Sequence, residues 1–186
     1  MAERGRGAAE RYAPQVRFRA IGARGQERLA AADVAVVGLG ALGTVSAGQL
    51  VRAGVGRLRL IDRDLVEWSN LQRQILYDED DARRGVPKAI AAAEHLRAVN
   101  AAVQLVPAVI DVTPRNVEGL LADCDLVVDG TGNLETRFLL NDACLHRGLP
   151  WVYAGAVGSS GSVMAIVPGR TPCLRCLIDR APAPGA

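Results

Sequence analysis

The stretch VAVVGLGALGTVSAGQLVRAGVGRLRLIDRD, residues 34–64, decides the fold. A β-branched run leads through three glycines into a helical pattern, and a second apolar run ends at Asp62. The spacing of Gly38, Gly40 and Gly43 is typical of a turn that lets the backbone approach a phosphate and packs the next helix close. The helix amino terminus then faces the anion, and Asp62 is placed to accept hydrogen bonds from ribose hydroxyls. The stretch therefore predicts a nucleotide-binding strand–turn–helix–strand unit.

The same alternation of apolar runs and helical patterns continues along the chain. Strands are expected at residues 34–38, 57–62, 103–110, 125–130 and 151–156, and helices at 41–53, 87–98, 114–122 and 134–147. Such alternation predicts parallel strands joined by crossover helices. We expect an α/β, Rossmann-like three-layer fold with a mostly parallel central sheet. Residues 1–31 are expected to form an N-terminal helical arm, 32–178 the nucleotide-binding domain, and 179–186 a tail or linker.

Length and composition favour one cytoplasmic domain. The 186 residues, 49% of them apolar, are enough for one well-buried domain but few for two. A formal net charge of +2 without runs of like charge indicates neither a nucleic-acid nor a membrane partner. No apolar segment reaches the length of about eighteen residues that a membrane span needs, and the N-terminus lacks the apolar core of a secretory signal. The four cysteines are therefore expected as thiols or metal ligands.

Polar side chains beyond the ribose position favour ATP over a dinucleotide, because a dehydrogenase needs no polar cluster there. The cluster consists of Ser69, Asn70, Gln72, Arg73 and Gln74. Arginine offers a planar fork that holds phosphate oxygens and stays charged. Lys88 is the only lysine among the 22 lysine and arginine residues, and it follows Pro87, a residue suited to a first helical turn. The ammonium group of Lys88 is a point charge that suits the phosphates of a nucleotide. The alternative interpretation is that Lys88 is an ordinary exposed lysine at the end of a helix.

Five segments together resemble a known family. They are GLGALG (38–43), IDRDLVEWSNLQRQ (61–74), GVPKA (85–89), DGTGNLETRFLLNDAC (129–144) and PCLRC (172–176). Their order and spacing resemble those of the MoeB/ThiF/HesA superfamily, the bacterial relatives of ubiquitin-activating enzymes. Members bind ATP with magnesium and adenylate the C-terminal glycine carboxylate of a small ubiquitin-like sulfur-carrier protein, releasing pyrophosphate. The resemblance implies that this protein has the same adenylating activity and that it forms a homodimer.

The resemblance also implies roles for single residues. Asn70, Arg73 and Lys88 would contact the triphosphate, with Arg73 and Lys88 supplying positive charge as pyrophosphate departs. The implied nucleotide-binding residues are Gly38, Gly40, Ala41, Gly43, Asp62, Asp64, Ser69, Asn70, Gln72, Arg73, Lys88, Gly132 and Asn133. No protein nucleophile is needed, because the carrier's carboxylate attacks the α-phosphorus.

Two positions depart from the family pattern. Pro14 stands where the family carries an arginine that reaches into the neighbouring protomer's site, with Arg11 and Arg17 nearby as substitutes. Gly132 stands where a magnesium-binding aspartate is expected, which leaves Asp129 as the nearest candidate magnesium ligand. A non-catalytic nucleotide-binding or dimer-scaffold relative is therefore the alternative function. A third possible function is that of a nicotinamide-dependent oxidoreductase, which only the spacing of the glycines supports.

The cysteines divide into two pairs. Cys173 and Cys176 resemble half of the family's structural zinc site, which needs four thiolates, so zinc is expected only if a second pair is supplied. Cys124 and Cys144 lie in apolar patterns and are expected in the core. Neither histidine has the spacing of metal ligands, so both are expected on the surface or in packing.

Overall fold

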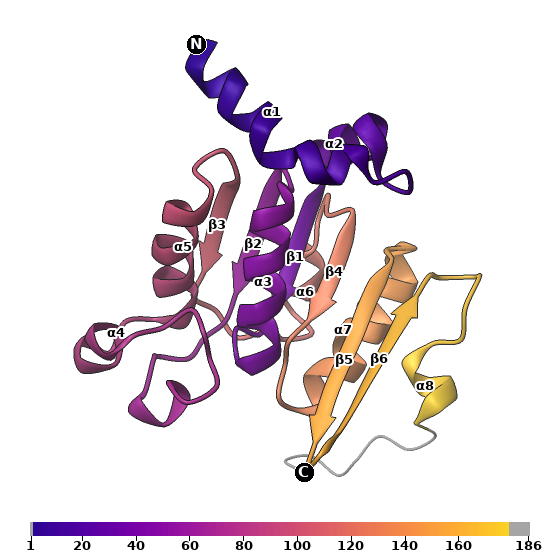
Figure 1. Ribbon diagram of the computed structural model, residues 1–186. Coiled ribbons are helices and arrows are strands. Elements are labelled where there is room, and N and C mark those ends of the chain that lie inside the picture. Colours follow the sequence, from indigo (N-terminus) through magenta and orange to yellow (C-terminus); the bar gives the residue numbers. More distant parts are fainter. Residues whose placement is uncertain (1, 179–186) are drawn as a thin grey trace.

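A six-stranded sheet forms the centre of the molecule in a computed structural model that describes residues 2–178 (Figure 1). The strands lie in the order β3-β2-β1-β4-β5-β6, in which β1 to β5 are parallel and β6 is antiparallel to β5. Their bounds are β1 Asp33–Val37, β2 Arg57–Ile61, β3 Gln104–Ala108, β4 Leu126–Asp129, β5 Trp151–Val157 and β6 Ser160–Ile166. The predicted Rossmann-like fold with a mostly parallel sheet is confirmed. The predicted tail, 179–186, lies outside the described residues.

Helices cover both faces of the sheet (Figure 1). They are α1 Ala2–Arg17, α2 Gly22–Ala31, α3 Ala41–Ala53, the 3-10 turn η1 Trp68–Asn70, α4 Glu79–Arg84, α5 Lys88–Val99, α6 Val117–Leu120, α7 Leu134–Arg147 and α8 Leu174–Leu177. Alternate residues of a strand face opposite sides of a sheet. Val34 and Val36 accordingly join the core beneath α3 and α5, whereas Ala35 and Val37 join the core beneath α6 and α7. No described helix is long and apolar enough to cross a lipid bilayer.

The N-terminal arm, α1 and α2, packs at the end of the sheet where the parallel strands begin (Figure 1). A Cβ added to Gly54 would come within 2.4 Å of the Tyr12 phenol, so the ring lies directly on the end of α3. The Tyr12 hydroxyl accepts a hydrogen bond from Asn100 Nδ2 at 2.8 Å. Arg11, a predicted substitute for the missing family arginine, donates to the Val99 carbonyl at 2.9 Å. Arg11 therefore caps α5 of its own chain.

The strand β6 is the main addition to the predicted fold. All five predicted strands form within two residues of their expected bounds, and α3 and α7 match their predicted ranges. The small residues at 158–161 do not signal a strand, yet Gly158 takes a left-handed conformation (φ +59°) that reverses the chain. The following residues then pair antiparallel with β5 along its length. The sequence also does not predict the short helices α4 and α8.

Candidate active site

The glycine-rich turn after β1 lies directly against the turn after β4. Gly38 has φ +84°, and a Cβ there would come within 2.7 Å of the Gly130 carbonyl carbon. A Cβ on Gly130 would in turn come within 2.3 Å of the Gly38 oxygen, and one on Gly43 within 1.8 Å of the same atom. These three positions therefore need glycine for steric reasons. β1 and β4 are neighbours at the point where the strand order reverses, which is where open α/β sheets bind ligands.

The amino terminus of α3 presents free backbone donors beside this turn. Gly40 precedes the helix, and no side chain caps it. The first N–H groups of an α-helix, here those of Ala41, Leu42 and Gly43, have no partner within the helix. A Cβ on Gly40 would make only ordinary van der Waals contacts, the nearest at 3.9 Å to the Gly130 oxygen, so this position does not require glycine for steric reasons. The free donors and the helix dipole make this end of α3 suited to an anion.

Leu39, within the turn, is held through both of its backbone groups. Its N–H donates to Asp62 Oδ2 at 2.6 Å, and the Asp64 N–H donates to Asp62 Oδ1 at 2.8 Å. The Leu39 carbonyl accepts a hydrogen bond from the buried Tyr77 hydroxyl at 2.9 Å. Burial raises the pKa of Tyr77 well above its ordinary value, so the hydroxyl keeps its proton and remains a donor. Asp62 thus organises the turn besides its predicted contact with ribose.

Tyr77→Phe is expected to weaken ATP binding by roughly fivefold while the protein stays folded, because the turn that faces the nucleotide loses the hydrogen bond that restrains Leu39. Isothermal calorimetry measures the affinity. Tyr12→Phe is the matched control, since it removes a tyrosine hydrogen bond at the opposite end of the sheet. It should lower the melting temperature but leave ATP affinity unchanged. An equal loss of affinity in both variants would argue against a local role for Tyr77.

The predicted phosphate-binding cluster lies in η1 and the residues after it. Asn70 is buried, and its Oδ1 accepts a hydrogen bond from the Glu67 N–H at 3.1 Å, which closes the turn. Arg73 is exposed and donates to the Ser69 carbonyl at 2.8 Å. Ser69 and Gln72 are also exposed. Asn70 therefore shapes the segment, while Arg73 retains guanidinium donors for a ligand.

Lys88 is buried at the start of α5, which contradicts the alternative of an ordinary exposed lysine. Its Nζ lies 3.1 Å from Asp64 Oδ2, and its backbone N–H donates to the Asp64 carbonyl at 2.9 Å. Asp64 also bonds Asp62, which holds the glycine-rich turn. A chain of short contacts thus links Lys88 to Leu39. A buried ammonium group held by a single exposed carboxylate is well placed to exchange that partner for phosphate oxygens.

Gln74 is an additional polar residue of this site that the implied set of binding residues omits. The side chain is only 4% exposed, and its Oε1 has no hydrogen-bond partner among the described residues. Its Nε2 lies 4.0 Å from the position that a Cβ on Gly40 would take. Buried polar groups are seldom left without a partner. An unsatisfied carboxamide beside an uncapped helix end fits a site that is completed by a polar ligand.

Asp129 lies at the end of β4 with its side chain fully buried. Oδ1 accepts hydrogen bonds from the Thr131 N–H and hydroxyl at 2.8 and 2.7 Å, and Oδ2 faces Arg137 Nε at 3.4 Å. Burial raises the pKa of this carboxyl, an effect that the Thr131 bonds and Arg137 oppose. The arrangement argues against the predicted magnesium role of Asp129, because the side chain is fully buried, Oδ1 is hydrogen-bonded to Thr131, and Oδ2 faces the charged Arg137.

The residues after β4 offer no replacement carboxylate. Gly132 is exposed, and a Cβ there would meet nothing within 4 Å. Asn133, a predicted nucleotide-binding residue, caps α7 by accepting a hydrogen bond from the Thr136 N–H at 2.8 Å. The residues at the family's magnesium position therefore do not fit a protein-held magnesium ion.

Sequence comparison assigns the family. The profile described as "ThiF family" matches residues 12–186. The chain belongs to the ThiF family. The resemblance found in its glycine-rich turn and its SNLQRQ and PKA segments is thereby confirmed.

Relatives of this ThiF-family chain include the sulfur carrier protein ThiS adenylyltransferase of Bacillus subtilis (strain 168), 49% identical over 95% of this chain and 52% of its own length. The sulfur carrier protein adenylyltransferase of Thermus thermophilus is 41% identical over 95% of this chain and 66% of its own length. A crystal structure of E. coli MccB with ATP has a TM-score of 0.81 and 26% identity, covering 89% of this chain and 50% of MccB. The chain thus spans about half to two thirds of these relatives.

The Cys-x-x-Cys pair of this ThiF-family chain lies at α8, which is held against α7. The Sγ atoms of Cys173 and Cys176 are 3.7 Å apart. The Leu174 N–H donates to Asn141 Oδ1 at 2.9 Å, and Arg175 Nε donates to Asp142 Oδ1 at 2.8 Å. The two thiols converge as a zinc half-site would require, but they supply only two of the four ligands of a structural zinc ion.

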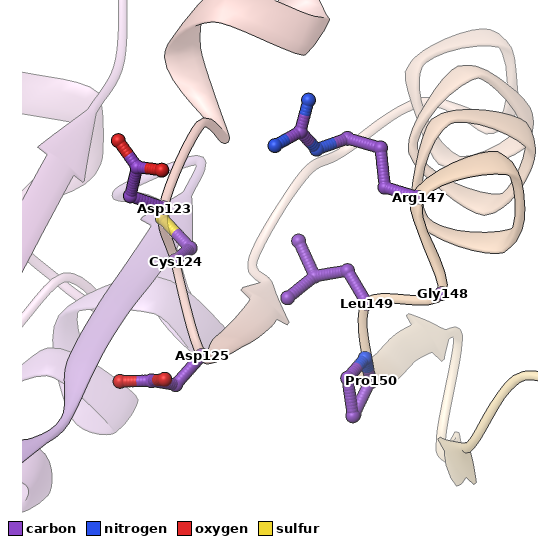
Figure 2. A pocket seen from close by; sticks show the side chains of 7 residues that line it. All are labelled: Asp123, Cys124, Asp125, Arg147, Gly148, Leu149 and Pro150. Carbon is purple, nitrogen blue, oxygen red and sulfur yellow. The ribbon is translucent and has the colours of Figure 1, made fainter.

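A hollow of about 310 Å³ lies at the other end of the sheet, before β4 and β5 (Figure 2). It is lined by Asp123, Cys124, Asp125, Arg147, Gly148, Leu149 and Pro150. Burial raises the pKa of the Cys124 thiol to about 11, so the thiol stays protonated near neutral pH and is a poor nucleophile. Cys144 is buried as predicted, whereas Cys124 is only partly buried. The hollow is remote from the glycine-rich turn and forms no part of the candidate active site.

Proposed function

We propose that this ThiF-family chain binds ATP at the glycine-rich turn and adenylates the C-terminal glycine carboxylate of a small ubiquitin-like sulfur-carrier protein. The observation that carries the proposal is the chain of contacts that joins the turn at Leu39, through Asp62 and Asp64, to the buried Lys88. The names of two relatives, both sulfur carrier protein adenylyltransferases, support the same activity. MccB, a solved structure of the same fold, binds ATP.

The chemistry needs alignment and positive charge rather than a nucleophilic side chain. A carboxylate oxygen of the carrier attacks the α-phosphorus of ATP, and the bond from that phosphorus to the bridging oxygen of the β-phosphate breaks. The products are the carrier's acyl adenylate and pyrophosphate. The α3 amino terminus, Arg73 and Lys88 stabilise the charge that moves onto the departing pyrophosphate. Magnesium, when bound to the triphosphate, would neutralise part of its charge.

Three further properties follow from the family resemblance and are part of the proposal. Magnesium would reach this site with the nucleotide, because phosphate oxygens and water can supply most of its ligands. A homodimer is expected, although Pro14 removes the arginine that the family sends into its partner's site. Zinc would bind Cys173 and Cys176 only with a second cysteine pair.

A non-catalytic relative that binds nucleotide is the second candidate function. Pro14 and Gly132 favour it, since each replaces a charged residue that the family pattern places at the active site. An ATP–pyrophosphate exchange assay with candidate carrier proteins separates the two functions. Carrier-dependent exchange supports the adenylating enzyme, whereas ATP binding without exchange supports the non-catalytic relative. Binding of NAD in preference to ATP would overturn both.

Gly132→Asp is expected to raise pyrophosphate exchange at limiting magnesium by roughly fivefold, because the new carboxylate supplies about 1 kcal/mol of additional binding to the metal. The substitution is sterically open, and Gly132 is not among the glycines with positive φ. Gly119→Asp is the matched control, since it adds the same charge at another open position, in α6. Unchanged magnesium dependence in a folded Gly132→Asp variant would favour the non-catalytic function.

A further inference from the structure

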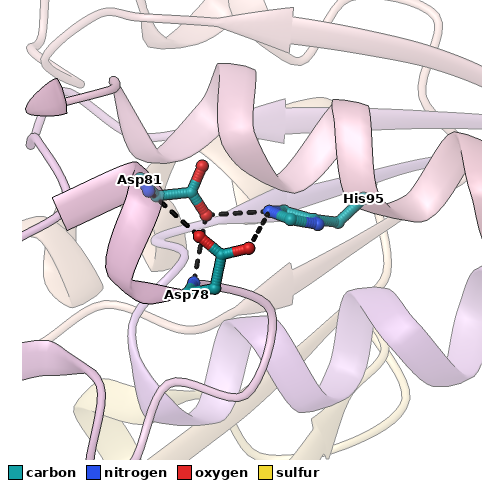
Figure 3. Close-up of side chains that lie close together, drawn as sticks. All are labelled: Asp78, Asp81 and His95. Carbon is teal, nitrogen blue, oxygen red and sulfur yellow. Dashed lines mark hydrogen bonds and ion pairs between the residues drawn. The ribbon is translucent and has the colours of Figure 1, made fainter. Parts of the chain in front are cut away.

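We propose that Asp78, Asp81 and His95 form a binding site for a transition-metal cation of the Zn²⁺ type that joins α4 to α5 (Figure 3). One ligand atom from each residue lies within 4.8 Å of the other two. His95 Nε2 is 2.8 Å from Asp81 Oδ2 and 4.0 Å from Asp78 Oδ2. The two carboxylates come from the start of α4, and the imidazole comes from the middle of α5. The three groups therefore converge from two separate elements.

The capping of α4 accounts for only part of this cluster. Asp78 Oδ1 accepts hydrogen bonds from the Asp80 and Asp81 N–H groups at 2.9 and 3.0 Å. Asp81 Oδ2 accepts one from the Asp78 N–H at 3.1 Å. Asp78 Oδ2 takes no part in the cap and is directed toward the imidazole (Figure 3). His95 is not needed for capping at all. The cap thus fixes the two carboxylates. The imidazole Nε2 shares a hydrogen bond with Asp81 Oδ2 and lies 4.0 Å from Asp78 Oδ2.

The charge balance of the cluster points to a cation. Asp81 is only 5% exposed, and a buried carboxylate needs a compensating charge. Within the described part of the chain, the basic side chain in contact with Asp78 and Asp81 is His95, which is charged only when it is protonated. The nearby arginines, Arg83 and Arg84, pair with Glu79 and Asp80 instead. A divalent cation bound by the imidazole nitrogen and the two carboxylates would reduce the repulsion between the carboxylates and supply a compensating positive charge.

The donor set selects the class of metal. One imidazole nitrogen and two carboxylate oxygens suit Zn²⁺ and its neighbours Co²⁺ and Ni²⁺, whereas Mg²⁺ prefers oxygen ligands only. Three protein ligands leave a coordination position for water. Because α5 begins at Lys88, a metal here would fix the helix that carries this lysine against the segment that precedes it. The proposal does not depend on the proposed function.

The test is zinc binding by calorimetry and Co²⁺ absorption spectroscopy, using the full chain with Cys173→Ser and Cys176→Ser so that the thiols cannot bind metal. We expect one metal ion per chain and a melting temperature that rises with Zn²⁺ concentration, as mass action requires. His95→Gln should lower the zinc affinity by about tenfold or more. Substitution of residues that merely support a metal ligand already lowers metal affinity by about tenfold or more. His146→Gln, which changes the other histidine, should bind as tightly as the parent.

Asp78→Ser provides a second variant in which folding is preserved, because serine caps helices nearly as well as aspartate. It should melt like the parent without metal but lose the zinc-dependent increase in melting temperature. Equal zinc affinity in His95→Gln and the parent would overturn the proposal. So would the absence of saturable zinc binding by the folded parent.

Discussion

Gly43→Ala is expected to lower the free energy of unfolding by about 3 kcal/mol or more. Losses of this size are typical of substitutions that create a severe steric conflict. The added methyl group would sit 1.8 Å from the Gly38 carbonyl oxygen, which is backbone and cannot rotate away. Either α3 or the turn after β1 must move, and both carry groups that face the nucleotide. A fall of about 10 °C in melting temperature follows from a loss of this size in a domain of this length. ATP binding should be lost even where the variant remains folded.

Gly48→Ala is the matched control for this steric argument. Gly48 is buried in the same helix, yet a Cβ there would meet nothing within 4 Å. Alanine is the better helix former, so this variant should be as stable as the wild type or more stable by up to about 1 kcal/mol. Urea unfolding of the two variants measures the contrast. If Gly43→Ala and the wild type unfold at the same urea concentration, then α3 and the turn after β1 do not approach each other as closely as described.

Lys88→Met is expected to reduce ATP affinity and pyrophosphate exchange by roughly 10 to 150-fold, the equivalent of about 1.5–3 kcal/mol for a hydrogen bond to a charged group. Methionine retains a long apolar side chain, so the packing around the start of α5 is largely kept. Asp64, the ion-pair partner, is more than half exposed and can be hydrated when the ammonium group is removed. The substitution should therefore lower ATP affinity and leave the stability of the protein nearly unchanged.

Arg97→Met is the control for Lys88→Met, because it removes a positive charge from an exposed position of the same helix. It should leave ATP affinity unchanged. Calorimetry and the exchange assay are run on both variants, with a melting curve for each. Wild-type ATP affinity in a folded Lys88→Met variant would remove Lys88 from the proposed site and weaken the case for adenylation.

The strand–turn–helix unit at residues 34–64 could be predicted because its signals are local. β-branched runs, glycine spacing and the acid at the end of β2 all lie within one stretch, and each has one favoured structural interpretation. Lys88 could be selected because it stands alone among arginines. Its burial and its pairing with Asp64 depend on the tertiary fold, which the sequence pattern does not specify.

The interactions that the sequence did not reveal join residues far apart in the chain. Tyr77 reaches back to Leu39, and His95 meets Asp81 across two helices. Neither contact has a characteristic spacing, because the first depends on how the segment before α4 packs on the turn after β1, and the second on how α4 packs against α5. The surroundings of Asp129 could not be predicted for a related reason: an acid at the end of a parallel strand suits a metal ligand, but its contacts with Arg137 and Thr131 depend on the tertiary fold.

The contact between Gly38 and Gly130 has a consequence for how this site can change during evolution. A side chain on either residue strikes the backbone of the other turn, and a side chain on both would make the conflict worse. Neither position therefore offers a neutral first step toward another residue. Variation in ligand preference must enter elsewhere, at positions such as Gly132 where a new side chain meets open space. The contact between the two turns is therefore fixed, and a change in ligand preference has to come from residues outside it.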